Sequence, residues 1–303
     1  ASGCHWYFDR KYGYDQGFAR WRGYAVGKDE MERVPTSKQA TDTAINFLTD
    51  LSAGALPDDG KDPRQDLGSV APWFLFVHYL DPHKHYIDHK GFTPFGKSGR
   101  DRYDGEVRFT DHHIGRLLDA ARKADPDLSN TMVILFSDHG ESFGEHGEKF
   151  HGRDLFDVQL RVPLLIKVPE GKAKRFKTRV SILNIAATVL DAVGIERPSS
   201  FRGSSLLGPL TTGKEPLQRP IYAEMPPGPY NGEFRALIDG DQKIIHRLHG
   251  NFYRMFDLGS DPAEGKDLYR SQPQEAAQLL ERYKLWRATH LEPVDATYKP
   301  RRR

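Results

Sequence analysis

The stretch Thr131-Met132-Val133-Ile134-Leu135-Phe136-Ser137-Asp138-His139-Gly140 decides the fold class. Its apolar residues are typical of a strand buried on both faces of a sheet, and the strand ends in a carboxylate and an imidazole. Trp73 to Leu80 and Val162 to Val168 have the same apolar character. Helical patterns alternate with these strands, at 36–51, 103–123 and 181–193. This alternation predicts an α/β fold with a mostly parallel central sheet flanked by helices.

The sequence pattern changes after about residue 215. The segments 234–238 and 242–246 flank Gly240-Asp241, which predicts a β-hairpin. Another strand is expected at 251–258, followed by an amphipathic helix at 274–289. We therefore predict an α/β domain at 1–215 and a small C-terminal α+β subdomain at 216–303, an antiparallel sheet with a helix, packed on it.

Composition excludes several classes of function. The chain has 44 Lys and Arg against 42 Asp and Glu, and this balance gives no reason to expect a nucleic-acid partner. It has no apolar run of about 18 residues, so we expect no membrane span in this chain. A single cysteine, Cys4, excludes an intrachain disulfide, and it is interpreted as an incidental thiol. The Gly-, Pro- and Asp-rich stretch 54–69 predicts an exposed loop.

Two of the predicted strands end in residues that are suited to chemistry. In an open parallel sheet, ligands bind beyond the carboxyl ends of the strands. Asp81-Pro82-His83 follows one strand, and Asp138-His139-Gly140-Glu141 follows another, with His151-Gly152 shortly after. Asp138 and His139 together can reach a divalent cation. An ordinary turn is the alternative, but the strand in front and the nearby polar groups favour the metal. His83 fits a catalytic role and a structural role equally well.

Other polar residues carry less information. Glu141, Glu145 and Glu148 are open to a solvated-surface interpretation, which we favour for Glu148. We expect an exposed position for His112. His246 and His249 are assigned to the surface of the C-terminal hairpin.

The order of motifs along the chain resembles the sulfatase family of the alkaline phosphatase superfamily. The segments that carry the resemblance are Tyr12-Gly13-Tyr14-Asp15-Gln16-Gly17-Phe18, Phe74 to His83, Tyr103 to Val107, Ser137 to Gly147, Leu160 to Ile166 and Met255 to Glu264. Each motif alone is weak, but their shared order over nearly the whole chain is specific. The resemblance implies an alkaline-phosphatase-like fold.

The resemblance also implies roles for individual residues. Asp138 and His139 match a pair of metal ligands in the family. His83 matches the histidine that contacts the sulfate or the leaving oxygen, and His151 falls where many sulfatases place a substrate-binding lysine, so both are expected to be catalytic. Lys84 and His85 are expected to contact the substrate. The histidine at 151 is itself similar to the phosphotransferase-like members of the superfamily.

The chain departs from the family pattern at the nucleophile. The family's Cys-x-Pro-Ser-Arg or Ser-x-Pro-Ser-Arg motif, whose first residue becomes formylglycine, is absent from residues 1–303. The chain therefore resembles the C-terminal two-thirds of a sulfatase, with the formylglycine expected in an N-terminal segment. That segment is a candidate partner as a separate piece. Because Asp138 and His139 alone bind an ion weakly, we expect little hydrolase activity from 1–303 in isolation.

The expected cofactor is one divalent metal ion. Ca²⁺ is the first expectation, and the imidazole of His139 also admits Mn²⁺ or Zn²⁺. The leading functional hypothesis is a metal-dependent hydrolase of sulfate esters, acting on a small anionic ester. A phosphoester or phosphonate hydrolase, or a headgroup phosphotransferase, is the second hypothesis, favoured by His151. The third is a non-catalytic binding or assembly fragment, which a metal titration would separate from the other two.

Overall fold

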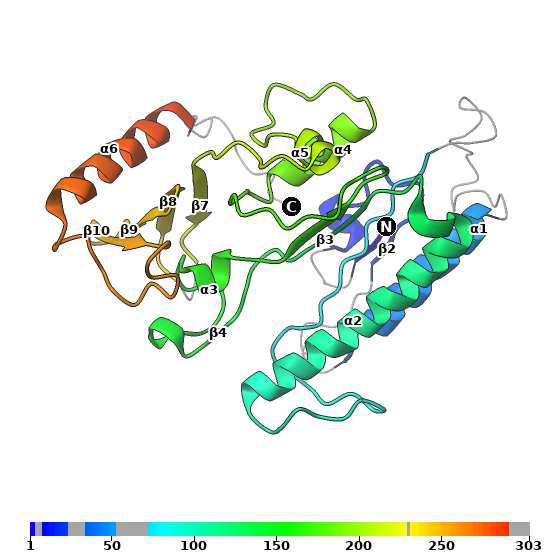
Figure 1. Ribbon diagram of the computed structural model, residues 1–303. Helices are drawn as coiled ribbons and strands as arrows, with labels where there is room; N and C mark the ends of the chain where they lie inside the picture. The colour runs from blue at the N-terminus through cyan, green and yellow to red at the C-terminus, as the bar shows by residue number, and fades with distance from the viewer. Residues whose placement is uncertain (4–7, 24–33, 53–71, 229–230, 291–303) are drawn as a thin grey trace. The chain divides into compact units, whose positions relative to one another are not determined.

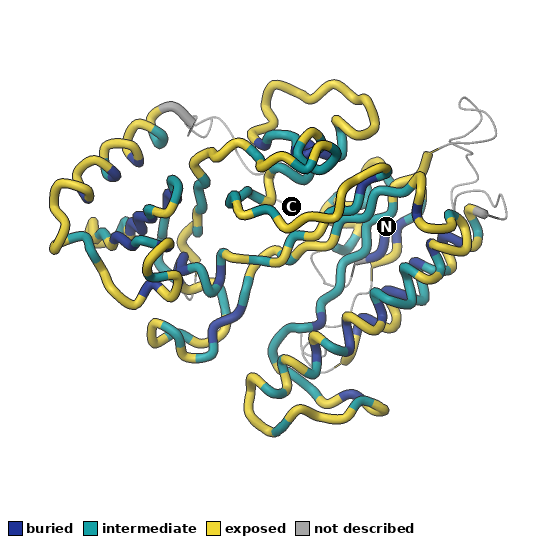
Figure 2. The backbone as a smooth tube through the Cα atoms, viewed as in Figure 1, coloured by how far each residue is buried: buried dark blue, intermediate teal, exposed yellow. Residues whose placement is uncertain are grey.

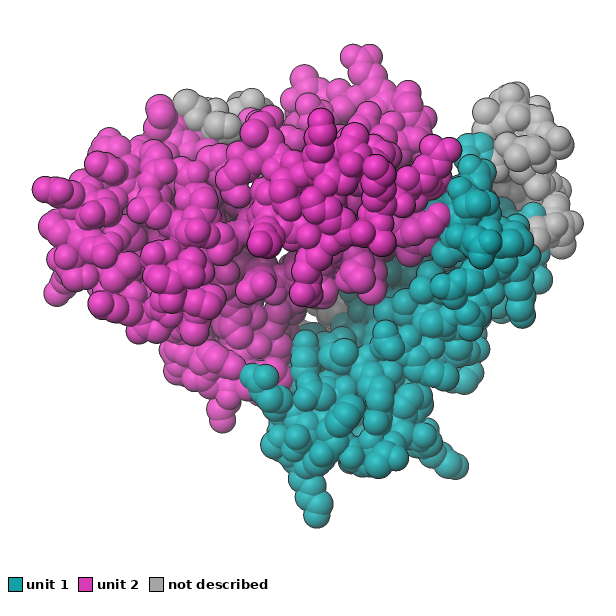
Figure 3. Space-filling view, viewed as in Figure 1, with its two compact units in different colours: residues 1–131 teal, residues 132–303 magenta. Residues whose placement is uncertain are grey.

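The computed structural model describes residues 1–3, 8–23, 34–52, 72–228 and 231–290 (Figure 1). Cys4 and the loop predicted at 54–69 lie outside the described residues. The chain divides into two compact units, residues 1–131 and residues 132–303, and each is described by itself (Figure 3). In the described part of the chain, no helix combines the length and the apolar character needed to cross a bilayer.

Two long helices dominate the first unit. Helix α1 spans Ser37–Ser52 and helix α2 spans Gly99–Ala124, which confirms both predicted helices (Figure 1). Ala40, Ala44, Phe47 and Leu48 recur on one face of α1 and are buried. Ser98 begins α2 with a capping box, since its hydroxyl accepts from Asp101 N and Asp101 accepts from Ser98 N. The other elements among the described residues of this unit are β1 (Ser2–Gly3), η2 (Arg10–Tyr12), β2 (Arg22–Gly23) and η3 (Pro126–Leu128).

The segment 73–80 differs from its prediction. Only Val77 has a bridge there, a parallel one with Ser2, supported by Ser2 N donating to Phe76 O and His78 N donating to Ser2 O. Trp73 and Phe74 remain 43% and 64% exposed. Burial on both faces requires a covering layer on each side of a strand. Among the described residues that cover is incomplete, so the prediction of a fully buried strand is wrong here.

The second unit begins with a strand pair. Strand β3 (Val133–Phe136) runs antiparallel to β6 (Leu164–Lys167), with Val133 opposite Lys167. Leu135 and Leu165 are 37% and 58% exposed, so the prediction that these strands are buried on both faces is also wrong for the described residues. Parallel pairing within the described residues is seen between β1 and β2 and at the Ser2–Val77 bridge, so a mostly parallel central sheet stays a prediction. Between β3 and β6 lie β4 (Ser142–Phe143), η4 (Glu145–Gly147), β5 (Lys149–Phe150) and α3 (Asp157–Leu160).

Helix α4 spans Asn184–Ala192, and a short α5 spans Leu207–Thr212. The helix predicted at 181–193 is thereby confirmed. Gly194, which follows α4, has a φ of +70°, and this left-handed conformation suits a glycine at a helix end.

The C-terminal part is an antiparallel sheet with a helix, as predicted. Its strands are β7 (Ile221–Met225), β8 (Phe234–Asp239), β9 (Gln242–Arg247) and β10 (Phe252–Asp257), in the order β10-β9-β8-β7. Helix α6 (Pro273–His290) buries Leu279 and Tyr283 against Leu237 and Ile244. Leu155 and Phe156 pack with Ile245 and Phe256 in a second cluster, and the sheet is correspondingly buried (Figure 2).

His246 is a correction to the sequence analysis. It is 4% exposed, with Nδ1 2.9 Å from the hydroxyl of Tyr283 and Nε2 3.0 Å from Oδ1 of Asn251. Side chains alternate along a strand, so His246 shares the face of Ile244 that α6 covers. Burial lowers the pKa of His246. His249, in contrast, is exposed as predicted.

Candidate active site

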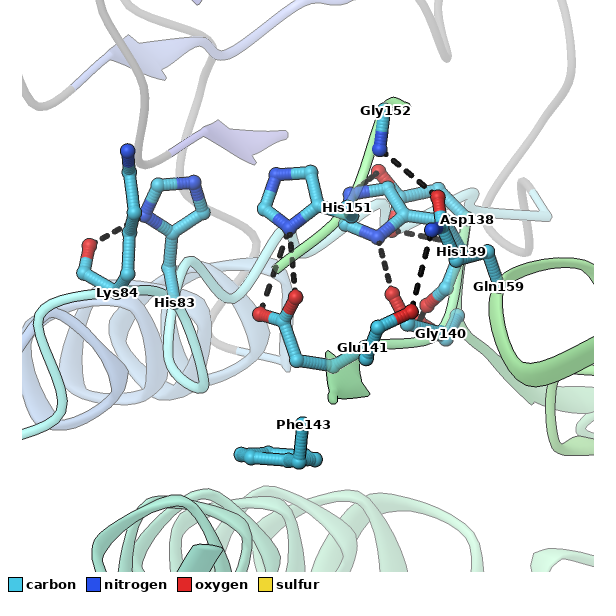
Figure 4. A network of polar contacts seen from close by, with 12 residues as sticks. His83, Lys84, Asp138, His139, Gly140, Glu141, Phe143, His151, Gly152 and Gln159 are labelled. Atoms are coloured by element: carbon cyan, nitrogen blue, oxygen red, sulfur yellow. Dashed lines mark hydrogen bonds and ion pairs between the residues drawn. The ribbon is translucent and has the colours of Figure 1, made fainter. Parts of the chain in front are cut away.

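The candidate metal ligands Asp138 and His139 lie on the loop that follows β3 (Figure 4). Ser137 Oγ donates to His139 O at 2.7 Å, and His139 N donates to Asp138 Oδ1 at 3.0 Å. Gly140 N donates to Gln159 O at 2.8 Å. A Cβ atom at position 140 would lie 2.2 Å from Val158 O, so this close backbone approach requires glycine. The loop is therefore anchored directly after the pair Asp138-His139.

The hydrogen bonds of His139 suit a metal ligand. Its Nδ1 lies 2.9 Å from Gly140 O, and because a carbonyl only accepts, Nδ1 carries the hydrogen and Nε2 carries the lone pair. A ligating histidine commonly has its other nitrogen bound to a backbone carbonyl in this way. Asp138 Oδ2 lies 3.7 Å from this Nε2, and the two side chains are 73% and 41% exposed. The two residues thus fit as ligands of one cation.

The two ligands do not complete a metal site. No cluster of three or more His, Cys, Asp or Glu side chains with metal-binding geometry occurs among the described residues. Metal ions in proteins usually have at least four ligands. Asp138 and His139 would therefore supply only part of a coordination shell.

A short hairpin places His151 beside this pair. In the antiparallel pairing of β4 with β5, Ser142 lies opposite Phe150. One step further along, Glu141 faces His151, and its two carboxylate oxygens are 3.2 and 3.4 Å from His151 Nδ1. The His151 ring stacks on the His139 ring with centroids 4.1 Å apart. The structure therefore brings together Asp138, His139 and His151, three of the residues selected from the sequence.

Glu141 is the residue whose role the sequence analysis missed. It is 9% exposed, whereas the sequence alone is also consistent with a solvated side chain. A carboxylate bound to Nδ1 of a histidine fixes the ring and its tautomer. The pairing of Glu141 with His151 could have been predicted from the sequence, since a hairpin between 142 and 150 sets the two residues opposite each other. Glu148 keeps 37% side-chain exposure in an ion pair with Arg153, and His112 is exposed as predicted.

The first unit holds the other selected residues. His83 is half-buried, and its Nδ1 lies 2.7 Å from Lys84 O, while Lys84 is half-buried and His85 is exposed. Asp81 has a structural role instead. Its carboxylate accepts from Thr36 N and from both N and Oγ of Ser37, at the start of α1. Because the two groups of residues belong to different units, their union in one site stays a prediction.

Comparisons with known proteins place the chain in a family. A model of the family described as Sulfatase matches residues 3–195, more than half of the chain, and a model of the C-terminal region of N-sulphoglucosamine sulphohydrolase matches residues 144–289. The chain is 34% identical over 193 residues to the N-acetylglucosamine-6-O-sulfatase of Bacteroides thetaiotaomicron. That match covers 59% of this chain and 34% of the relative, so the chain spans about a third of the relative's length.

Solved structures are also similar to this chain. One, in complex with its substrate D-glucosamine-2-N,6-O-disulfate, matches with 29% identity and a TM-score of 0.54, over 63% of this chain and 42% of that one. The crystal structure of Ps i-CgsB in complex with k-i-k-neocarrahexaose matches with a TM-score of 0.71 over 94% of this chain and 70% of that one. Its 18% identity supports the shared fold alone.

Proposed function

This chain belongs to the sulfatase family, and we propose that the native protein is a metal-dependent hydrolase of sulfate esters. One observation carries the proposal. Asp138 and His139 present a carboxylate oxygen and a lone-pair nitrogen 3.7 Å apart, and the ring of His151, held by Glu141, stacks against His139. Two metal-ligand atoms and an oriented imidazole are among the parts that transfer of an anionic group requires.

Asp138 and His139 would hold one divalent cation. Oxygen ligands suit Ca²⁺, our first choice, and the imidazole nitrogen also suits Mn²⁺ or Zn²⁺. When bound, such an ion neutralises negative charge on the substrate and on the nucleophile. In this family the nucleophile is a formylglycine, and the motif that contains it does not occur in residues 1–303. The anchored loop after β3 fixes both ligands before any ion binds.

The histidines are proposed to act on the substrate's oxygens. His83 Nδ1 bonds to a carbonyl, so it carries a hydrogen, and Nε2 is the atom that would exchange a proton with the leaving oxygen. His151 bonds through Nδ1 to Glu141, which directs Nε2 to the opposite side of the ring, where it would hold a sulfuryl oxygen. Lys84 and His85 follow His83 directly and would bind the remainder of the substrate.

We propose a sulfated amino sugar as the first substrate class to test. A curated relative carries the name N-acetylglucosamine-6-O-sulfatase, and a related structure contains a disulfated glucosamine. The proposed architecture is an α/β domain at 1–215 with a mostly parallel central sheet, and a C-terminal subdomain at 216–303. Whether this boundary is correct can be tested by limited proteolysis near residue 215.

The decisive experiment is a sulfate-release assay on the native protein with glucosamine 6-sulfate and 4-nitrophenyl sulfate. We expect metal-dependent release of sulfate, which His139→Ala abolishes. His249→Ala is the matched control, because His249 is an exposed histidine of the C-terminal part and should leave the rate unchanged. Metal-loaded native protein that hydrolyses neither ester would refute the proposal.

The resemblance at His151 favours a second candidate function. His151 stands where many sulfatases have lysine, and it resembles the phosphotransferase-like members of the superfamily. The alternative is hydrolysis or transfer of a phosphoester or phosphonate. Comparing kcat/KM for 4-nitrophenyl sulfate with that for a phenylphosphonate monoester separates the two functions. Tight metal binding with no turnover of either ester would instead support a non-catalytic role.

A further inference from the structure

Gln159 contacts all three backbone segments that carry the proposed active-site residues of the second unit. It lies on α3 and is 4% exposed. Its side-chain Oε1 accepts from Gly152 N at 2.9 Å, and its Nε2 donates to Ser142 Oγ at 3.2 Å (Figure 4). Its backbone oxygen accepts from Gly140 N at 2.8 Å. The one amide thus bonds to a hydroxyl on β4 and to an N–H two residues beyond the end of β5.

Each of these contacts is next to a residue of the proposed site. Gly140 follows the metal ligand His139, Ser142 follows Glu141, and Gly152 follows His151. The β4–β5 pairing alone extends over two residue pairs, Ser142–Phe150 and Phe143–Lys149. A ladder this short leaves the ends of its strands weakly held. The Gln159 side chain closes the end of the hairpin at which Glu141 faces His151.

We propose that Gln159 is a positioning residue for the reaction, in that it sets the separation of Glu141, His151 and His139. This inference rests on the proposed function. Gln159 touches none of the reacting atoms. Its amide instead joins Ser142, which follows Glu141, to Gly152, which follows His151, while its backbone oxygen holds the loop that bears His139. Loss of the amide contacts would let the two strands separate and the His151 ring rotate away from His139.

The contacts of Gln159 predict how substitutions should rank. Gln159→Met keeps the length and volume of the side chain but removes both hydrogen bonds. Gln159→Glu keeps an acceptor for Gly152 N, and the hydroxyl of Ser142 can then donate instead of accept. The Glu variant should therefore retain more of the site's geometry than the Met variant. Leu160→Ala is the matched control, because Leu160 lies on the same helix and packs against an apolar cluster.

The experiment uses the native protein loaded with Ca²⁺ and has three readouts: steady-state kinetics on a sulfate ester, hydrogen exchange of the Gly152 amide, and ¹⁵N spectra of the His151 ring. For Gln159→Met we expect kcat to fall by about 10–100-fold with KM little changed, since misplacement by about an ångström has such effects. The Gly152 amide should exchange faster, and the His151 Nδ1 signal should shift. Gln159→Glu should lie between Gln159→Met and the wild type in all three.

The outcomes separate this inference from the proposed function. If the wild-type protein hydrolyses the ester and Gln159→Met matches it in kcat and in Gly152 exchange, the positioning role is overturned. It is also overturned if Leu160→Ala lowers kcat as much as Gln159→Met does. If the wild-type protein releases no sulfate while Gln159→Met still changes Gly152 exchange and the His151 signal, the proposed function fails and the structural part of the inference stands.

Discussion

The imidazole of His113 should make the first unit less stable in mild acid. His113 lies on α2 and is 5% exposed. Arg116 donates to its Nδ1 at 3.0 Å, and because a guanidinium only donates, that nitrogen must carry a lone pair. Protonation would break this bond and set two cations side by side. Burial, and next the charge of Arg116, lower the pKa of His113 to about 4, from an ordinary value of 6.5.

The sign and the size follow from this pKa. Above pH 6.5 the imidazole is neutral in the folded and unfolded chains, so it does not affect stability. As the pH falls from 6.5 toward 4, the unfolded chain binds a proton that the folded chain does not, and unfolding becomes easier. The full difference of about 2.5 pKa units is worth about 3 kcal/mol. Between pH 8 and pH 5 the loss should be about 2 kcal/mol.

The measurement is hydrogen exchange of α2 amides during urea unfolding, at pH 8 and at pH 5. His113→Asn is the test variant, because the asparagine Oδ1 can replace Nδ1 as an acceptor for Arg116 and does not titrate. Between pH 8 and pH 5 its free energy of unfolding should fall by about 2 kcal/mol less than that of the wild type. His112→Asn, at the exposed neighbouring position, is the control and should keep that dependence. Equal pH dependence in the wild type and His113→Asn would refute the reasoning.

Three further predictions concern the second unit. Lys243 is fully buried between two carboxylates, one of them Glu264 at 2.7 Å. Lys243→Met should therefore lower the free energy of unfolding, measured with urea, by about 3–5 kcal/mol. A decrease below about 1 kcal/mol would contradict this. Gly140→Ala places a Cβ against Val158 O, and Mn²⁺ titration should show a loss of affinity of about tenfold or more. Loss of a group that only supports a ligand lowers metal affinity by roughly 10–100-fold. Asp138→Ala removes a proposed ligand itself, so it should lower Mn²⁺ affinity by at least as much. Unchanged binding would exclude Asp138 as a ligand.

Helical spacing and hairpin turns are local patterns, and elements that depend on them are predicted correctly from the sequence. The apolar spacing in α1 forms one buried face, and Gly240-Asp241 with its flanking strands forms a local hairpin. On α2 the buried residues include the polar Glu106, Thr110 and His113. The segment 73–80 failed because apolar character shows that a strand can be buried, while cover on each face depends on distant parts of the chain. The Ser2–Val77 bridge shows how far apart such partners can be.

The same distinction explains the outcome for the site. Asp138 and His139 could be selected from one short motif after a strand, whereas the environment of each other histidine depends on register and packing. His246 was assigned to the surface because its immediate neighbours suggested a hairpin, yet Tyr283 on α6 buries it. His151 acquires a carboxylate partner only because Ser142 pairs with Phe150, which brings Glu141 opposite it. Strand register therefore decides which imidazoles can take part in chemistry, and a side chain that holds the register, as we propose for Gln159, belongs to the site although it does not contact the reacting atoms.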